Sequence, residues 1–285
     1  MCLFCFFHQF PPLFPCSSAL NRSFCFYIVV IMVVEDVLRT KIGIQGLDKA
    51  LNGGVPSGNI VLISGGAGTG KSTFCLQYLV NGATIFGEKG LYISTEQNKE
   101  ELYKQSACFN WNLADLEQKN LVKIAYFDIT GADGFPERLN NYIQEFKPKR
   151  LVIDSLTTLT DTLLVSGIGE DKAFSMVQIA ETVNPIPRTE QIVTKNILYL
   201  LFKEIKKFGV TTLLTTEMPE DQKTLSADGV SEFIADGVIA LYYLGVGAVD
   251  FRSSQIRKMR YTSHEKKPIL FEIGESGMEI HIEEE

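Results

Sequence analysis

The first 31 residues of this chain contain no acidic residue and a single basic one, Arg22. They hold four of its six cysteines and seven of its nineteen phenylalanines. Their apolar run, residues 24–34, is about eleven residues long, short of the ~20 that span a bilayer. A secretory signal is also disfavoured, because the basic start and the small-residue cleavage site are missing. We therefore predict no membrane association.

A zinc site in this apolar, Cys/Phe-rich head is a weaker alternative. The candidate ligands are Cys2, Cys5, His8, Cys16 and Cys25. The second half of the head lacks a Cys-x-x-Cys pair, and turn-forming residues are few. Composition favours a disordered head, or one produced by an early start codon with Met32 as the working start. We predict a head over residues 1–31 and one folded domain over residues 32–285.

Cysteine is scarce beyond the head, where only Cys75 and Cys108 occur, both in apolar surroundings. This pattern excludes a disulfide framework and suits a reducing cytoplasm. An excess of positive charge is also absent, since the formal net charge is −7. That balance argues against a general nucleic-acid coat, although it does not exclude a local basic stripe.

Short apolar runs alternate with helical patterns from residue 40 onward, which indicates an α/β fold around a mainly parallel sheet. No internal repeat is visible, so we expect one such domain rather than two. The predicted strands are 59–64, 91–95, 121–127, 150–156 and 210–216. One predicted helix begins after residue 70 and ends at about residue 81, and two more cover 137–146 and 197–208. Closely spaced strands at 238–244, 255–262, 268–273 and 278–282 are typical of C-terminal antiparallel hairpins.

Residues 64–73 read SGGAGTGKST, between an apolar strand and a helical pattern. The spacing Gly65-x-x-x-x-Gly70-Lys71-Ser72 fits a phosphate-binding loop, whose glycines let backbone amides point at the nucleotide phosphates. Lys71 would reach the β- and γ-phosphates, and Ser72 would bind Mg²⁺ at the start of a helix that favours anions. The predicted nucleotide-binding residues are Gly65, Gly66, Ala67, Gly68, Thr69, Gly70, Lys71, Ser72 and Thr73.

Carboxylates follow three predicted strands. Asp154 ends an apolar strand, where open α/β sheets place ligand-facing groups, and it is the predicted second Mg²⁺ ligand beside Ser72. Glu96 directly follows strand 91–95, although a Glu in a first helical turn is also favoured electrostatically. Thr216 and Glu217 end a further strand; they could sense the γ-phosphate or simply form a turn before Pro219.

The motifs in their order resemble KaiC-like ATPases of the RecA/RadA superfamily over residues 40–282. The matching stretches are 43–48 (GIQGLD), 51–58 (LNGGVPSG), 90–96 (GLYISTE), 110–113 (NWNL), 152–156 (VIDSL) and 258–260 (KMR) followed by His264. The resemblance implies a RecA-type P-loop core, commonly assembled as a six-membered ring with ATP between protomers. Archaeal single-domain relatives resemble RadA paralogues that influence recombination, which makes single-stranded DNA or a recombinase an expected partner.

The resemblance also implies roles for individual residues. Glu96 would polarise the attacking water. Lys258 and Arg260 would reach the γ-phosphate of the adjacent subunit's ATP, so that hydrolysis depends on assembly. We therefore predict Glu96, Lys71, Lys258 and Arg260 as catalytic residues, with ATP and Mg²⁺ bound.

Several positions depart from the family pattern. Gln97 replaces a usual second glutamate, which predicts slow turnover, and Tyr261 replaces a glycine after the arginine. Glu232 and Phe233 stand where autophosphorylating domains carry adjacent Ser and Thr, so a phosphorylation clock is not expected. Residues 160–194 form a longer segment than expected, which is a candidate partner-binding loop or a surface excursion.

An ATPase that couples ATP binding and hydrolysis to a ring conformation is the leading hypothesis. Against DNA, the segment 217–236 has one lysine and many acids, whereas a DNA channel should offer cations and stacking aromatics. The alternatives are an ATP-gated regulatory assembly protein with little turnover, and a protein kinase acting on a partner.

Overall fold

A computed structural model describes residues 37–127, 134–166, 190–246 and 249–280. The chain divides between Val37 and Leu38, and the fold described below belongs to the unit that begins at Leu38. The predicted head, residues 1–31, lies outside the described residues. The same holds for residues 167–189 of the long segment predicted as a partner-binding loop.

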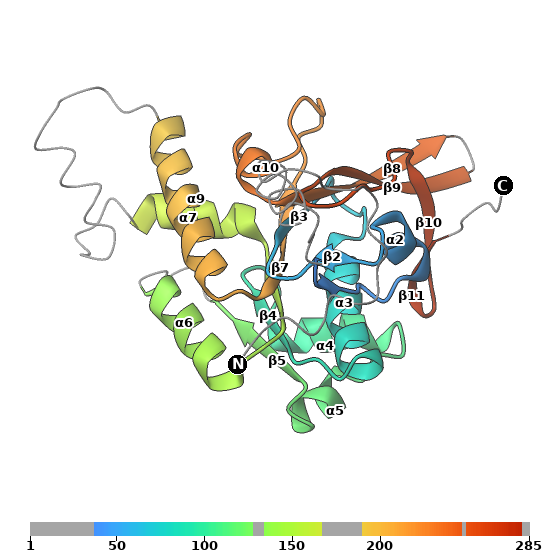
Figure 1. The fold of residues 1–285 in the computed structure, drawn as a ribbon, viewed down its shortest axis with the longest axis horizontal. Helices are drawn as coiled ribbons and strands as arrows, with labels where there is room; N and C mark the ends of the chain where they lie inside the picture. The colour runs from blue at the N-terminus through green and yellow to red at the C-terminus, as the bar shows by residue number, and fades with distance from the viewer. Residues whose placement is uncertain (1–36, 128–133, 167–189, 247–248, 281–285) are drawn as a thin grey trace, which may run out of the picture. The chain divides into compact units, whose positions relative to one another are not determined.

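A nine-stranded sheet in the order β11-β10-β9-β8-β3-β7-β6-β4-β5 forms the centre of this unit (Figure 1). Strands β3, β7, β6, β4, β5 and β8 run parallel, and β9, β10 and β11 pair antiparallel beyond β8. The strand bounds are β3 Ile60–Gly65, β4 Gly90–Ser94, β5 Val122–Tyr126, β6 Arg150–Asp154, β7 Thr211–Glu217, β8 Gly237–Val246, β9 Val249–Met259, β10 Ile269–Gly274 and β11 Gly277–Ile280. A separate pair joins β1 (Arg39–Thr40) to β2 (Val55–Pro56).

Helices cover both faces of the sheet, and each face has its own apolar core (Figure 1). One face carries α2 (Gln45–Ala50), α3 (Lys71–Ile85), α4 (Lys99–Ala107) and α5 (Leu113–Gln118). The other carries α6 (Phe135–Phe146), α7 (Leu156–Ser166) and α9 (Glu190–Lys207). Every residue of β3, β4 and β6 is buried, because parallel strands covered on both sides need apolar side chains on both faces.

The predicted fold class, a RecA-type mainly parallel sheet flanked by helices with C-terminal antiparallel hairpins, is confirmed. Element boundaries differ in places. Helix α9 begins seven residues before the predicted residue 197, and β9 begins at Val249 instead of residue 255. Part of the predicted loop 160–194 is helical, because α7 extends to Ser166 and α9 starts at Glu190.

Helix α4 was not predicted. Of its residues only Leu102 and Ser106 are buried, so its sequence carries almost no apolar periodicity. Its start is nevertheless encoded by a capping box, in which Asn98 accepts from the Glu101 amide and Glu101 accepts from the Asn98 amide. Within the described part of the chain, no helix has both the length and the apolar content needed to cross a bilayer.

Candidate nucleotide-binding site

The phosphate loop, residues 66–70, joins β3 to α3. Gly68 and Gly70 have positive φ angles of 72° and 98°, which favour glycine. A Cβ at Gly65 would lie 2.5 Å from Thr69 Oγ1, whereas a Cβ at Gly66 or Gly68 would meet no atom within 4 Å. The loop is therefore tightly packed where it leaves β3 and open above Gly66 and Gly68, as a cradle for a phosphate group requires.

Lys71 is the first residue of α3, and its ammonium group folds back over the loop. The Nζ atom donates to the carbonyl oxygens of Gly65 at 2.8 Å and Gly66 at 2.9 Å. Burial lowers the pKa of Lys71, and the charges of Glu217, Asp154 and Glu96 oppose that shift. Three carboxylates from three different strand ends thus act on this one lysine.

Asp154 is the last residue of β6 and is 5% exposed. Its Oδ2 atom accepts from the Tyr92 hydroxyl at 2.5 Å, and its Oδ1 atom accepts from the Thr215 hydroxyl. Burial and the Asp154 charge together raise the pKa of Tyr92, so this tyrosine stays protonated and donates. The carboxylate is therefore held from both neighbouring strands, β4 and β7.

Glu96 follows β4, and its side chain is exposed at the same edge of the sheet. Its Oε1 atom accepts from the Ser155 hydroxyl at 2.5 Å and the Thr158 hydroxyl at 2.9 Å. Ser155 follows Asp154 directly, through a cis peptide bond. The hydroxyl groups of Ser155 and Thr158 therefore fix one oxygen of Glu96 near Asp154, the candidate metal ligand.

Strand register explains why these groups gather. Gly65 pairs with Glu217 across β3 and β7, and Ser94 pairs with Asp154 across β4 and β6. The carboxyl ends of four neighbouring parallel strands therefore meet at one edge, which is where open α/β sheets bind ligands. The structure brings together the predicted residues Lys71, Asp154 and Glu96, with Glu217 beside them.

The donor set fits a nucleotide-bound Mg²⁺ better than a metal held by protein alone. Among the described residues, no group of three or more His, Cys, Asp or Glu side chains could hold a metal ion. Mg²⁺ commonly uses one or two protein groups together with substrate phosphates and water. Ser72, partly exposed in the first turn of α3, and Asp154 supply such a partial set.

Lys258 and Arg260 lie at the opposite edge of the sheet. Lys258 pairs with Val238 near the start of β8, whereas the phosphate loop begins beside Leu241. Gly237 at the start of β8 pairs with Val61, four residues before Gly65, a separation of about 13 Å along a strand. The structure therefore does not bring these two predicted catalytic residues to the phosphate loop of the same chain.

Both cations have partners within the chain. The Lys258 ammonium donates to the carbonyl oxygens of Glu232, Phe233 and Ala235 at 3.2, 3.0 and 2.6 Å, at the end of the short helix α10 (Ser231–Ile234). Burial and the neighbouring Arg260 charge lower the pKa of Lys258. Arg260 Nη1 binds Asp236 Oδ1 at 3.0 Å.

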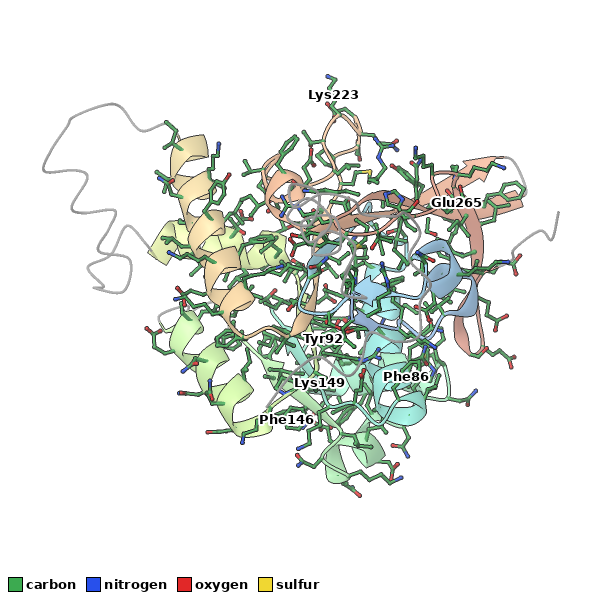
Figure 2. The ribbon with its side chains drawn as sticks, viewed as in Figure 1. Phe86, Tyr92, Phe146, Lys149, Lys223 and Glu265 are labelled. Atoms are coloured by element: carbon green, nitrogen blue, oxygen red, sulfur yellow. The ribbon has the colours of Figure 1, made fainter. Side chains whose placement is uncertain are left out.

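The acidic segment 217–236 uses its carboxylates to order itself. Glu232 accepts from the amide of Leu225, and Asp228 accepts from the amides of Val230 and Ser231. Lys223 projects into solvent at the tip of this segment, with 82% of its side chain exposed (Figure 2). The segment thus offers a folded, acidic loop with one outward lysine.

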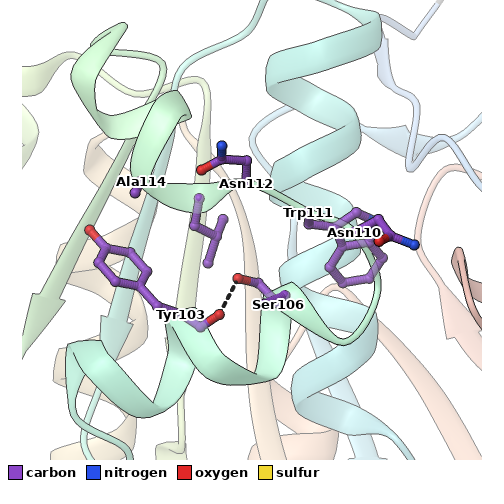
Figure 3. A pocket seen from close by; sticks show the side chains of 8 residues that line it. Tyr103, Ser106, Asn110, Trp111, Asn112 and Ala114 are labelled. Carbon is purple, nitrogen blue, oxygen red and sulfur yellow. Dashed lines mark hydrogen bonds between the residues drawn. The ribbon is translucent and has the colours of Figure 1, made fainter.

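A separate pocket of about 320 Å³ lies between α4 and α5 (Figure 3). It is lined by Tyr103, Ser106, Ala107, Asn110, Trp111, Asn112, Leu113 and Ala114. The Ser106 hydroxyl within it donates to the Tyr103 carbonyl at 2.9 Å. None of these residues belongs to the predicted phosphate loop, so the pocket is distinct from the candidate nucleotide site.

Sequence reasoning missed the side chains that orient the site. Tyr92 and Thr215 hold Asp154, Ser155 and Thr158 hold Glu96, and Gln105 Nε2 contacts Thr73 Oγ1 at 3.4 Å. Ser155 could have been found from the sequence, because it directly follows Asp154 in the chain. Thr215 and Tyr92 could be found only from the strand order, which places β4 and β7 on either side of β6.

Comparisons with known proteins identify relatives of this chain. A family model described as ATPase: KaiC matches residues 40–171 and 164–285. The circadian clock oscillator protein KaiC of Prochlorococcus marinus (strain MIT 9313) is 32% identical over 248 residues, covering 84% of this chain and 45% of the relative. KaiC of Synechococcus elongatus is 31% identical over 256 residues, covering 86% and 44%.

A solved structure shows the same fold. The KaiC-like protein of the hyperthermophilic archaeon Pyrococcus horikoshii OT3 superposes with a TM-score of 0.70 at 32% identity, covering 87% of this chain and 100% of that chain. This chain spans less than half the length of the curated clock proteins that it matches. The matched family model and these relatives show that the chain belongs to the KaiC-like ATPase family of the RecA superfamily.

Proposed function

We propose that this chain binds Mg-ATP in the phosphate loop and hydrolyses it in a ring of identical subunits, with six as the expected number. The observation that carries the proposal is the division of the predicted site between two edges of one sheet. Lys71, Asp154 and Glu96 share one edge, whereas Lys258 and Arg260 occupy the other. A second copy of the chain would bring the two halves together.

The chain's own groups suit this reaction. Lys71 exchanges the carbonyl oxygens of Gly65 and Gly66 for phosphate oxygens, which interact more strongly because they are charged. Glu96, with one oxygen fixed by Ser155 and Thr158, orients the attacking water through its other oxygen. Mg²⁺ held by Ser72 and Asp154 would neutralise charge on the phosphates. Arg260 from the neighbour stabilises the transition state.

Steady-state ATP hydrolysis by the full chain over a range of protein concentrations tests the proposal. The rate per subunit should rise with concentration for the native chain and stay low for Arg260→Ala. Arg257→Ala is the matched control, since Arg257 is likewise an exposed arginine and lies three residues before Arg260, on β9. A rate per subunit that does not depend on concentration, together with a fully active Arg260→Ala variant, would refute the shared site.

A second candidate is an ATP-gated assembly protein with little turnover. Gln97 replaces a second carboxylate beside Glu96, and its Oε1 atom is buried without a hydrogen-bond partner in the described structure. ATP-dependent assembly with negligible hydrolysis would favour this function. The same assay with single-stranded DNA tests a role in recombination or repair, since stimulation by DNA would identify such a partner. Phosphate transfer to an added protein would instead indicate a kinase.

A cytoplasmic location is also proposed. Cys75 is a buried free thiol and Cys108 an exposed free thiol among the described residues. Exposed free thiols persist in reducing compartments.

A further inference from the structure

Asp236 stands between α10 and β8, at the sheet edge that carries Arg260. Its side chain is 9% exposed and accepts hydrogen bonds from three parts of the chain, namely β3, α9 and the residue that follows β9. Oδ2 accepts from the Ile60 amide of β3 at 3.0 Å and from the Lys206 ammonium of α9. Oδ1 accepts from Arg260 Nη1 at 3.0 Å.

The backbone at Asp236 reinforces this junction. The Asp236 amide donates to the Ile60 carbonyl at 2.9 Å, and the Arg260 amide donates to the Asp236 carbonyl at 2.9 Å. Both the main chain and the side chain of Arg260 are therefore tied to the same residue. The backbone hydrogen bond fixes the point where the Arg260 side chain begins, and the ion pair with Asp236 fixes its guanidinium group.

The ion pair leaves most of the guanidinium available. A guanidinium carries five N–H donors in a rigid fork, and the hydrogen bond to Asp236 uses one nitrogen. The Arg260 side chain keeps 46% of its surface exposed. Lys206 shares the carboxylate through the other oxygen, so Asp236 retains a cation when Arg260 contacts another group.

We propose that Asp236 is a positioning residue that aims Arg260 at the nucleotide of a neighbouring subunit. This inference rests on the proposed function, because it assumes that Arg260 acts across an interface. Fixing the cation in advance avoids the entropic cost of ordering a long side chain during the reaction.

Mixing two variants separates positioning from simple stabilisation. Asp236→Asn keeps its own phosphate loop and Glu96 but presents a misaimed Arg260. Glu96→Gln presents an intact Arg260 but lacks the proposed water-orienting carboxylate. Alone, Asp236→Asn should lower kcat on the order of 10- to 100-fold, while KM changes less than about twofold. Mixed with Glu96→Gln, it should regain activity, because the Glu96→Gln subunit supplies a correctly aimed arginine.

Two outcomes would overturn the proposal: a native kcat for Asp236→Asn, or a low rate that mixing does not restore although the variant is folded by circular dichroism. Asp236→Glu covers the case in which Asp236→Asn does not fold. It keeps the charge but displaces the guanidinium by a methylene, so it should be folded, slow and restored by mixing. A fully active Asp236→Glu variant would also contradict the proposal.

Controls separate this inference from the proposed function. Asp115→Asn removes an exposed carboxylate of α5 that pairs with Lys119, and it should leave kcat unchanged. Arg260→Ala should behave like Asp236→Asn in both assays. If Arg260→Ala is fully active, the shared site fails; if it is slow while Asp236→Asn is fast, only the positioning role fails.

Discussion

At the scale of single residues, Lys71 contacts its own loop and lies within the electrostatic field of three carboxylates. Its ammonium group binds two carbonyl oxygens of its own loop, and burial disfavours its charge. A bound phosphate would replace these neutral acceptors with charged ones and thereby favour the ammonium form. The lysine is therefore placed to bind an anion in the loop.

Lys71→Ala should therefore weaken Mg-ATP binding by roughly 10- to 100-fold, since a hydrogen bond to a charged group contributes about 1.5–3 kcal/mol. Isothermal titration calorimetry with a non-hydrolysable ATP analogue measures the effect. Lys104→Ala, an exposed lysine of α4, should bind as the native chain does. Unchanged affinity for Lys71→Ala would remove residues 65–73 from the proposed site.

The residues of the site were predictable to different degrees. The glycine spacing around Lys71 is local, so the sequence alone located the loop and the start of α3. Asp154 and Glu96 were located because each follows an apolar strand. Their partners Thr215, Tyr92 and Thr158 belong to other strands or turns, and no local pattern marks a hydroxyl as a carboxylate ligand.

At the scale of elements, α3 packs against β6 around a fully buried arginine. Arg150 is 0% exposed and binds Glu88 Oε2 through Nη2 at 2.6 Å and the Tyr78 carbonyl through Nη1 at 2.9 Å. It also lies over the Tyr78 and Phe86 rings, at 4.6 and 5.2 Å from their centroids. The guanidinium is thus held on every side and cannot move to admit new atoms at low cost.

Gly82→Ala should destabilise the protein for this reason. A Cβ at Gly82 would lie 2.5 Å from Arg150 Cδ and Nε. Overpacking of this kind costs about 1–3 kcal/mol, and alanine recovers about 1 kcal/mol of helix propensity, so we expect a net loss of about 1 kcal/mol, with about 2 kcal/mol as the upper bound. Urea denaturation measures it. Thr84→Ala, an exposed site in the same helix, should stay within about 0.5 kcal/mol, and equal stability of both variants would contradict the packing argument.

Elements with strong periodicity were predicted best. The buried strands β3 and β6 contain continuous apolar runs, and α6 shows a clear apolar face. Helices α4 and α5 lie over the sheet with few buried residues, so their capping residues Asn98 and Asn112 were the available signals. The early start of α9 was not predicted, because its first turns carry mostly polar residues and so lack a clear apolar periodicity.

At the scale of the whole folded unit, the stability of the fold depends on pH because the Asp236 carboxyl group titrates with a shifted pKa. Burial raises the pKa of this carboxyl, but hydrogen bonds from Lys206, the Ile60 amide and Arg260 outweigh it, so the pKa lies below 3.8. A depressed carboxyl pKa stabilises the fold above the unfolded value, and the stabilisation is lost as pH falls through the folded value. The affected window therefore begins near pH 3.8 and extends downward.

The difference in unfolding free energy between the native chain and Asp236→Asn should thus be larger at pH 7 than at pH 3. Denaturant titrations at the two pH values give this comparison. Asp115→Asn, whose carboxylate is exposed, should differ little from the native chain at both. If the Asp236→Asn difference were the same at pH 3 and pH 7, its carboxylate would not stabilise the fold through its charge.

The sequence by itself determined the position of the glycine-rich loop, the strand-ending carboxylates, the fold class and the family resemblance, because each depends on residues close together in the chain or on the order of apolar runs. The tertiary structure alone decided which strand ends are neighbours, and so which hydroxyls orient Asp154 and Glu96. It also placed Lys258 and Arg260 at the far edge of the sheet and joined Arg260 to Asp236 and Lys206. Strand order is set by the packing of two helical layers on one sheet, and no local sequence pattern specifies it.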